Sequence, residues 1–224
     1  MLLPQVPPQT PALQGGGKIE VKPYYDDGRG IVIYHGDCRE ILPLLESVDL
    51  LLTDPPYGIG FASRPTNYQR MNGMKASGWD DFKIDSTTLL SARNLARFQI
   101  IWGGNYYQLP LCRCWLVWTK PDSPPTMGSV EMAWTNIDRP ARHIDRSISA
   151  TNAERVGHPT QKPLDVMAWC ISLAPNSDTI LDPFMGSGTT LRAAKDLGRK
   201  AIGIEIEEKY CEIAVRRLAQ EVLL

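Results

Sequence analysis

The amino-acid sequence predicts an α/β fold built on a doubly wound, mostly parallel sheet. The first observation is the length of 224 residues, which suits one well-packed domain and is short for two. The second is the alternation of short apolar runs with helical patterns from about residue 19 onward. The third is that several runs, such as VDLLLT at 48–53, are apolar at almost every position, which is typical of parallel strands covered on both faces.

The N-terminal half begins with a segment of low complexity. Residues 1–18 contain four prolines and the run Gly15-Gly16-Gly17, so we expect a flexible tail ahead of a single domain at 19–224. Strands are predicted at 30–36, 48–53 and 99–104, helices at 38–47 and 87–98, and a loop at 58–85.

The C-terminal half continues the alternation. Strands are predicted at 115–121, 129–135, 178–182 and 200–205, which brings the predicted sheet to seven strands. Helices are predicted at 163–175, 189–198 and 207–224, the first of them because Pro163 suits a first helical turn. Residues 136–163 are polar and are predicted to be irregular.

Acidic residues stand at the ends of four predicted strands: Asp37, Asp54, Asp182 and Glu205. A single acid in such a place usually caps a helix or forms a turn. Four of them are harder to explain in that way, because the carboxyl ends of parallel strands meet at one edge of the sheet, where open α/β sheets bind their ligands. We therefore expect the four acids to line one crevice.

The third of these acids opens a glycine loop, Asp182-Pro-Phe-Met-Gly-Ser-Gly-Thr-Thr, between a strand and a helix. Gly186 and Gly188 allow the backbone to approach a ligand closely, and the amides of a helix start favour electronegative groups. Glu205 ends the next strand, where an acid can accept both hydroxyls of a ribose. Leu191 stands where a dinucleotide fingerprint has its third glycine, which disfavours a pyrophosphate ligand and favours a nucleoside cofactor.

The second acid begins the motif Asp54-Pro55-Pro56-Tyr57, directly after an apolar strand. Two consecutive prolines lack N–H groups and have a fixed φ, so the strand cannot continue and the corner is rigid. The tetrapeptide presents a carboxylate, a fixed carbonyl and an aromatic ring at one point. Taken alone, it is equally consistent with an ordinary proline-stiffened turn.

This motif, together with DPFMGSGTT at 182–190 and IGIEIEEKYCEIAVRRL at 202–218, resembles the amino-methyltransferases that methylate adenine N6 or cytosine N4 in DNA with S-adenosylmethionine. GDC at 36–38, WGGNYY at 102–107 and HPTQKP at 158–163 extend the resemblance over about residues 30–218. The order, with the catalytic motif before the glycine loop, resembles the beta class of these enzymes. The resemblance implies a Rossmann-like methyltransferase sheet of seven strands in circularly permuted order.

The resemblance also gives each acid a role toward the cofactor. Asp182 would hold the ammonium of its methionine part, Glu205 its ribose and Asp37 its adenine amine. The loop residues Phe184, Gly186 and Gly188 would lie beneath the methionine part. The other cofactor contacts implied are Cys38, Asp54 and Ser187, with His158, Thr160 and Lys162 as weaker candidates because a proline-stiffened connector also explains their segment.

The catalytic function implied for residues 54–57 follows from the chemistry of an exocyclic amine. Its lone pair is delocalised into the base, which makes the nitrogen a poor nucleophile. Acceptors on its two hydrogens, the Asp54 carboxylate and the Pro55 carbonyl, would localise the lone pair and stabilise the positive charge that develops on nitrogen. Pro55 and Pro56 would keep the corner rigid, and Tyr57 would stack on a base rotated out of the duplex.

Two basic stretches are candidates for contact with double-stranded DNA. The net charge of −1 argues against a protein that coats nucleic acid by charge alone. Locally, however, Arg64, Arg70 and Lys75 stand in a stretch without acids that follows Tyr57. Residues 122–157 occupy the place where this class carries its target-recognition region, here a small one. Replacing Arg139, Arg142 and Arg146 of that region with Ala is predicted to weaken DNA binding and to leave cofactor binding intact.

The target base and the class of substrate stay open at this point. An acid at position 54 favours adenine N6, with cytosine N4 as the alternative base. Methylation of RNA or of protein glutamine is also open, although the protein enzymes usually carry Asn at position 54, and so is a non-catalytic subunit that binds DNA or cofactor. Five cysteines and three histidines show no metal-ligand spacing, so no metal is expected. Without a membrane-length apolar run or a signal peptide the chain is expected in the cytoplasm, and a homodimer or a restriction partner is left open.

Overall fold

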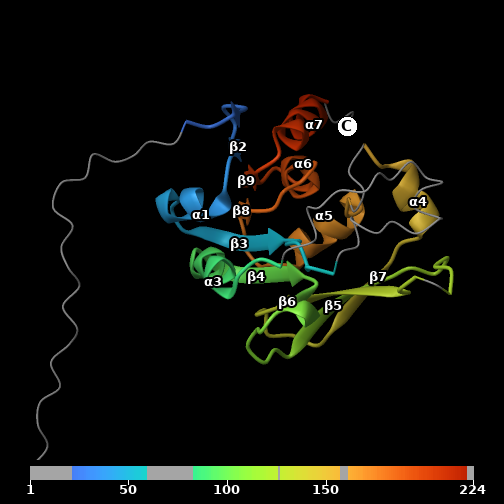
Figure 1. Ribbon diagram of the computed structural model, residues 1–224. Helices are drawn as coiled ribbons and strands as arrows, with labels where there is room; N and C mark the ends of the chain where they lie inside the picture. Colours follow the sequence, from blue (N-terminus) through green and yellow to red (C-terminus); the bar gives the residue numbers. More distant parts are fainter. Residues whose placement is uncertain (1–21, 60–82, 126, 157–160, 221–224) are drawn as a thin grey trace, which may run out of the picture.

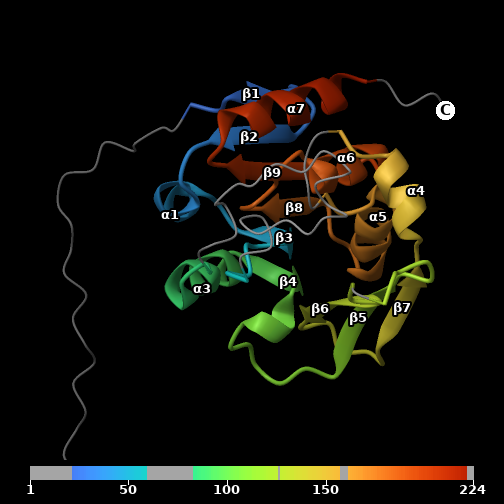
Figure 2. The same ribbon diagram turned by 45° about the vertical axis from the view of Figure 1, so that its right-hand side comes forward.

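The computed structural model describes residues 22–59, 83–125, 127–156 and 161–220 (Figure 1). Within this part of the chain, nine strands form one sheet in the order β1-β2-β9-β8-β3-β4-β6-β5-β7. In Figure 2 this order runs from top to bottom as far as β4, and β6, β5 and β7 then follow from left to right. Their bounds are β1 Tyr25–Asp26, β2 Ile31–His35, β3 Val48–Thr53, β4 Ala96–Trp102, β5 Cys114–Thr119, β6 Val130–Thr135, β7 Arg142–Asp145, β8 Thr179–Asp182 and β9 Lys200–Glu205.

The seven strands predicted from the sequence are the seven neighbours from β2 to β5. The pairs β2–β9, β9–β8, β8–β3 and β3–β4 are parallel, whereas β6 is antiparallel to both of its neighbours. At the two edges, β1 is antiparallel to β2 and β7 is parallel to β5. The predicted doubly wound, mostly parallel sheet is therefore confirmed, with two short edge strands that the sequence did not indicate.

The direction of the winding reverses at the centre of the sheet, between β3 and β8. From β3 the chain continues to its neighbour β4, whereas from β8 it continues in the other direction to β9. β3 and β8 are parallel partners, so their carboxyl ends lie side by side. Asp182 is the last residue of β8, and Asp54 directly follows β3. Open α/β sheets bind their ligands in the crevice at such a point.

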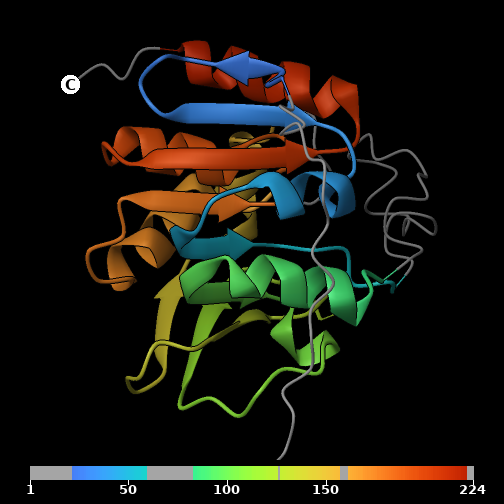
Figure 3. The same cartoon turned by 90° about the vertical axis from the view of Figure 1, so that its left-hand side faces the viewer.

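Helices cover both faces of the sheet (Figure 3). On one face lie α1 (Cys38–Ile41), the 3₁₀ turn η1 (Leu42–Leu44) and α3 (Ser86–Asn94), and on the other lie α5 (Leu164–Leu173), α6 (Thr189–Asp196) and α7 (Glu208–Ala219). The 3₁₀ turn η2 (Gly104–Tyr106) follows β4, and α4 (Ile148–Ala153) follows β7. Every helix in the described segments is too short or too polar to span a lipid bilayer.

In the N-terminal half, two predicted helices end earlier than expected. The helix predicted at 87–98 ends at Asn94, and the strand predicted from 99 already begins at Ala96 as β4. Ala96 pairs with Val48 at the start of the β3–β4 ladder, so pairing with a buried strand outweighs the helical pattern of this segment. The helix predicted at 38–47 ends at Ile41, because Pro43 supports a 3₁₀ turn in its place.

The segment 136–163, predicted to be irregular, contains β7 and α4. β7 extends the sheet beyond β5, with Asp145 opposite Thr119. Ser147 caps α4 by accepting the N–H of Ala150. Together with β6, these elements attach most of residues 122–157 to the sheet. The assignment of this region to target recognition stays a prediction.

Candidate active site

A cleft of about 1110 Å³ opens at the carboxyl edge of the sheet. Its lining combines the residues that follow β2, β3, β8 and β9 with residues from β5, β6 and the segment before α5. Asp37, Asp54, Asp182 and Glu205 all line it, as expected from their places at strand ends. Sites for a single small molecule measure about 300–1,000 Å³, so this cleft has room for a cofactor and a second ligand.

Asp182 is only 3% exposed and is held by three donors. Its Oδ1 accepts hydrogen bonds from the Thr53 hydroxyl at 2.8 Å and the Phe184 N–H at 3.2 Å, and its Oδ2 accepts one from the Thr190 hydroxyl at 2.5 Å. A carboxylate has about four acceptor positions, so one on Oδ2 is left for a ligand. Burial raises the pKa of Asp182 to about 6, although the hydrogen bonds from Thr190 and Thr53 oppose the shift. A cation placed here would therefore compensate a charge that the fold leaves poorly stabilised.

Glu205 holds the glycine loop from the neighbouring strand. Its Oε2 accepts the N–H of Gly186 at 2.9 Å, and its Oε1 accepts the N–H of Glu207 at 2.9 Å. One acceptor position is left on each oxygen, which matches the two adjacent hydroxyls of a ribose. Burial raises the pKa of the Glu205 carboxyl. Phe184 and Ser187 of the loop also line the cleft.

Asp37, predicted to accept from the cofactor's adenine amine, and Cys38, predicted as a cofactor contact, lie at the start of α1. Asp37 caps this helix by accepting the N–H of Arg39 at 2.9 Å, and its carboxylate forms an ion pair with the Arg39 guanidinium. The hydrogen bonds from Arg39 lower the pKa of Asp37. Cys38 is 8% exposed and lines the cleft. An adenine amine bound here would have to share the Asp37 carboxylate with Arg39.

Gly188, at the start of α6, has no room for a side chain. Its φ is +77°, and a Cβ would lie 2.7 Å from Cβ of Ala214 in α7. Gly188→Ala is expected to lower the free energy of unfolding by about 2–4 kcal/mol, because left-handed strain adds to overpacking. Urea denaturation measures this cost. Gly198→Ala is the matched control, with φ +66° and open space, and should cost only about 1 kcal/mol; equal costs would contradict the packing argument.

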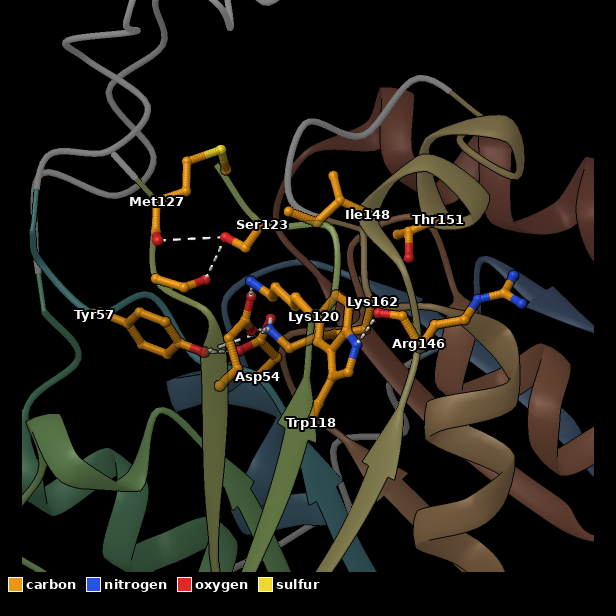
Figure 4. A network of polar contacts seen from close by, with 12 residues as sticks. Asp54, Tyr57, Trp118, Lys120, Ser123, Met127, Arg146, Ile148, Thr151 and Lys162 are labelled. Atoms are coloured by element: carbon orange, nitrogen blue, oxygen red, sulfur yellow. Dashed lines mark hydrogen bonds and ion pairs between the residues drawn. The ribbon is translucent and has the colours of Figure 1, made fainter. Parts of the chain in front are cut away.

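Asp54 lies near the centre of the cleft, and its two oxygens have different partners (Figure 4). Its Oδ1 accepts a hydrogen bond from the Tyr57 hydroxyl, and its Oδ2 lies 2.5 Å from Nζ of Lys162. Burial raises the pKa of the Asp54 carboxyl, and the charge of Lys162 opposes this shift. Burial and the charge of Asp54 hold the pKa of Tyr57 well above its usual value, so the phenol stays a donor.

The two prolines present their carbonyls differently. The Pro56 carbonyl accepts a hydrogen bond from the Tyr107 hydroxyl at 2.5 Å, which ties the corner to the segment after β4. The Pro55 carbonyl takes part in no hydrogen bond among the described residues. Both prolines line the cleft next to Asp54. The arrangement leaves the Pro55 carbonyl as an acceptor beside the Asp54 carboxylate.

The Tyr57 ring packs closely against Gly103 and Tyr106. A Cβ at Gly103 would lie 2.0 Å from Cε1 of Tyr57, so the approach of the ring requires glycine there. The Tyr106 ring stacks on Tyr57 with 4.9 Å between centroids and 18° between planes. A base that stacks on this face of Tyr57 must take the place of Tyr106, which is 40% exposed. Sequence reasoning did not name Gly103 or Tyr106 as site residues, although both belong to the quoted run WGGNYY.

Lys162, one of the weaker candidates for a cofactor contact, lies between two carboxylates. Its ammonium is 2.5 Å from Oδ2 of Asp54 and 3.0 Å from Oε2 of Glu131, and its side chain is 7% exposed. Burial alone would lower the pKa of Lys162, but the two carboxylates raise it above its usual value. Glu131 on β6 was missed by sequence reasoning. Its one signal was an acid inside the predicted strand SVEMAWT.

Five of the predicted site residues lie outside the described part of the chain. They are the cofactor candidates His158 and Thr160 and the DNA-contact candidates Arg64, Arg70 and Lys75. Their roles stay predictions.

The three arginines predicted to bind DNA from residues 122–157 do not share one surface. Arg139 and Arg142 lie near the start of β7, toward the amino edge of the sheet, because Arg142 pairs with the third residue of β5. Arg146 lies beyond the end of β7, but its guanidinium forms ion pairs with Glu154 and Asp165. Figure 4 shows this side chain pointing away from Asp54 and Lys162. These three arginines therefore do not form one basic patch beside the cleft.

This placement changes the expected result of replacing these arginines. Arg139→Ala and Arg142→Ala should leave the DNA dissociation constant and its salt dependence unchanged, because the cleft opens at the opposite edge. Arg146→Ala should lower the free energy of unfolding by up to about 1 kcal/mol through the loss of two partly exposed ion pairs. DNA binding across a salt series and urea denaturation measure the two effects. A salt slope reduced by about one in Arg139→Ala or Arg142→Ala would show a phosphate contact at the amino edge and contradict this account.

The chain is similar to known DNA-modifying proteins along most of its length. The model of the N6_N4_Mtase family, described as DNA methylase, matches residues 98–216. Type II methyltransferase M.HinfI of Haemophilus influenzae is 31% identical, in a match that covers 84% of this chain and 68% of the relative. Type II methyltransferase M2.LlaDCHI of Lactococcus lactis subsp. cremoris is 28% identical, in a match that covers 91% of this chain and 94% of the relative.

Solved structures show the same fold. The crystal structure of the M1.HpyAVI-SAM complex matches with a TM-score of 0.55 and 23% identity, covering 84% of this chain and 98% of that one. The PvuII DNA methyltransferase, described as cytosine-N4-specific, matches with a TM-score of 0.59 and 16% identity, covering 87% and 88%. At these identities the likeness concerns the fold alone.

Proposed function

The chain belongs to the N6_N4_Mtase family of DNA methylases, and we propose that it methylates the exocyclic amine N6 of adenine in double-stranded DNA. Its methyl donor is S-adenosylmethionine, which supplies an electrophilic methyl group when it is bound. The observation that carries the proposal is the place of Asp54 and the Pro55 carbonyl. They lie at the end of β3, in one cleft with Asp182 and Glu205.

The residues of the cleft fit this donor. The buried Asp182 carboxylate keeps one acceptor position that suits a methionine ammonium. Glu205 keeps one acceptor position on each oxygen for the hydroxyls of a ribose, while its Oε2 also accepts the N–H of Gly186. The cleft volume of about 1110 Å³ leaves space for a base beside the donor.

Asp54 and the Pro55 carbonyl then act on the base. Each accepts one hydrogen of the amine, which directs the nitrogen lone pair out of the plane of the base. The nitrogen lone pair forms the new N–C bond as the S–C bond to the methyl group breaks and leaves its electron pair on sulfur. The nitrogen then loses a proton, which the Asp54 carboxylate takes. Burial raises the pKa of this carboxyl, which makes it a better proton acceptor than an exposed aspartate.

Adenine is preferred over cytosine because position 54 is an acid, whereas family members with serine at this position more often act on cytosine. The fold itself does not distinguish the two bases, since the PvuII enzyme described as cytosine-N4-specific has a similar fold. A non-catalytic subunit is disfavoured, because Asp54, Tyr57 and the glycine loop are all intact.

Single-molecule sequencing of DNA from cells that express the protein tests the proposal, because it reports base and site together. We expect N6-methyladenine at a short recurring sequence, and none in cells that express Asp54→Ala. Unmodified DNA, or N4-methylcytosine in place of N6-methyladenine, would refute the proposal.

A further inference from the structure

We propose that Lys162 and Glu131 are positioning residues for Asp54: Lys162 keeps its carboxylate ionised, and Glu131 shares Lys162, so that one oxygen of Asp54 is released when a base amine enters the cleft. The inference rests on the proposed function, since it concerns how Asp54 accepts that amine. Neither residue is required to touch the base or the methyl donor.

The basis is a chain of alternating charges along the cleft (Figure 4). Asp54 pairs with Lys162, Lys162 with Glu131, and Glu131 with Lys120. The two lysine side chains are only 7% and 11% exposed, so water screens these pairs weakly. The four residues come from the end of β3, the segment before α5, β6 and the end of β5. Two carboxylates and two ammonium groups leave the cluster without net charge.

Glu131 is needed because Lys162 alone would hold Asp54 too tightly. An ammonium with a single carboxylate partner lowers the pKa of that partner and occupies one of its oxygens. Glu131 offers the same ammonium a second carboxylate at 3.0 Å. Burial would raise the pKa of Glu131, but Lys162 and Lys120 lower it to about 2, so it stays charged. Lys162 can therefore remain bound to Glu131 while Oδ2 of Asp54 accepts the amine.

Other groups also face Asp54. The Tyr57 hydroxyl donates to Oδ1 and stays neutral, because its pKa is far above its usual value. Asp182, at the end of the neighbouring strand β8, is close enough for the charge of Asp54 to raise its pKa. Among the charged groups described here, Lys162 opposes the raised pKa of Asp54 most strongly, and Glu131 adds to it.

The test is the dependence of kcat on pH in Lys162→Gln and Glu131→Gln. Both variants should lower kcat by about 10- to 100-fold. In Lys162→Gln, Asp54 loses its cation and its pKa rises, so the acid limb should move about one unit to higher pH. In Glu131→Gln an anion is lost and Lys162 is left to Asp54, so the acid limb should move to lower pH. Glu131→Asp should restore the wild-type limb.

Two controls separate this role from others. Lys200→Gln removes a lysine at the start of β9, at the amino edge of the sheet, and should keep the wild-type profile. The affinity for S-adenosylmethionine should be unchanged in Glu131→Gln and Lys162→Gln, whereas a tenfold loss in Lys162→Gln would make this lysine a cofactor contact and overturn the proposal.

The proposal would also be overturned if kcat falls in Lys162→Gln and Glu131→Gln while the acid limb of the pH profile stays in place, or if the acid limb moves in the same direction in both variants. If Lys162→Gln fails to fold, the isosteric Glu131→Gln decides alone. A wild-type protein without transfer at any pH would instead refute the proposed function.

Discussion

Replacing Asp54 with Ala is expected to reduce methyl transfer to duplex DNA by about 10³- to 10⁴-fold. The variant loses an acceptor aimed at the developing positive charge, and it loses the group that takes the proton from nitrogen. The measurement is single-turnover transfer of a labelled methyl group at saturating S-adenosylmethionine. Binding of the donor should change little, because its proposed contacts Asp182 and Glu205 come from other strands.

Asp54→Asn is the matched variant for this experiment. It keeps the size of the side chain and one acceptor oxygen, but it removes the charge that pairs with Lys162. It should fold like the wild type. Its rate of methyl transfer should lie within about tenfold of that of Asp54→Ala, because an amide cannot take the proton. Wild-type rates in Asp54→Asn would show that the carboxylate charge has no part in the reaction.

Replacing Asp182 with Asn should weaken S-adenosylmethionine binding by about 150- to 5,000-fold at pH 8. The reason is that the ammonium of the donor would lose a buried charged partner, a change that costs about 3–5 kcal/mol. For the wild type the affinity should fall as the pH drops through about 6, where Asp182 takes up a proton. The variant should show no such dependence. Calorimetric titrations between pH 5 and pH 8 measure both effects.

The same substitution should leave the fold as stable as before, or more stable. The pKa of Asp182 is about 6 in the folded protein, against 3.8 for an ordinary aspartate. Because the pKa of Asp182 is higher in the folded protein than in the unfolded chain, this residue contributes stability when the pH lies below the pKa of the unfolded chain. The contribution is lost as the pH rises through about 6. At pH 8 the ionised side chain therefore costs up to about 3 kcal/mol, which Asn avoids. The gain in stability of Asp182→Asn should vanish at pH 4. An equal loss of stability at pH 4 and pH 8 would contradict a raised pKa for Asp182.

Much of the sheet could be predicted because its central strands carry their own signal. The runs at 48–53 and 200–205 are mostly apolar, and β3 and β9 have those bounds. The sequence failed where a partner decides the structure. Residues 95–98 have helical spacing but lie beside β3, and the polar segment 142–145 becomes a strand because β5 offers it an open edge. Such pairings depend on register, which local patterns do not contain.

The site was predictable to the extent that its residues stand in contiguous motifs. Asp54, Asp182 and Glu205 were found because each ends a strand, and all three line the cleft. The partners of Asp54 could not be found in this way. Lys162 and Glu131 are 31 positions apart in sequence and meet only through the packing of β6 against the segment before α5. A count of charges over 139–155 likewise cannot tell which edge of the sheet each arginine occupies.

The most direct test of the central claim is the nucleoside composition of duplex DNA after incubation with the purified protein and methyl-labelled S-adenosylmethionine. The DNA is hydrolysed, and the labelled nucleosides are separated and identified by mass. We expect the label in N6-methyladenine, and almost none when Asp54→Ala replaces the wild type. Label confined to N4-methylcytosine would contradict the assignment of the base, and equal label from both proteins would contradict the role of Asp54.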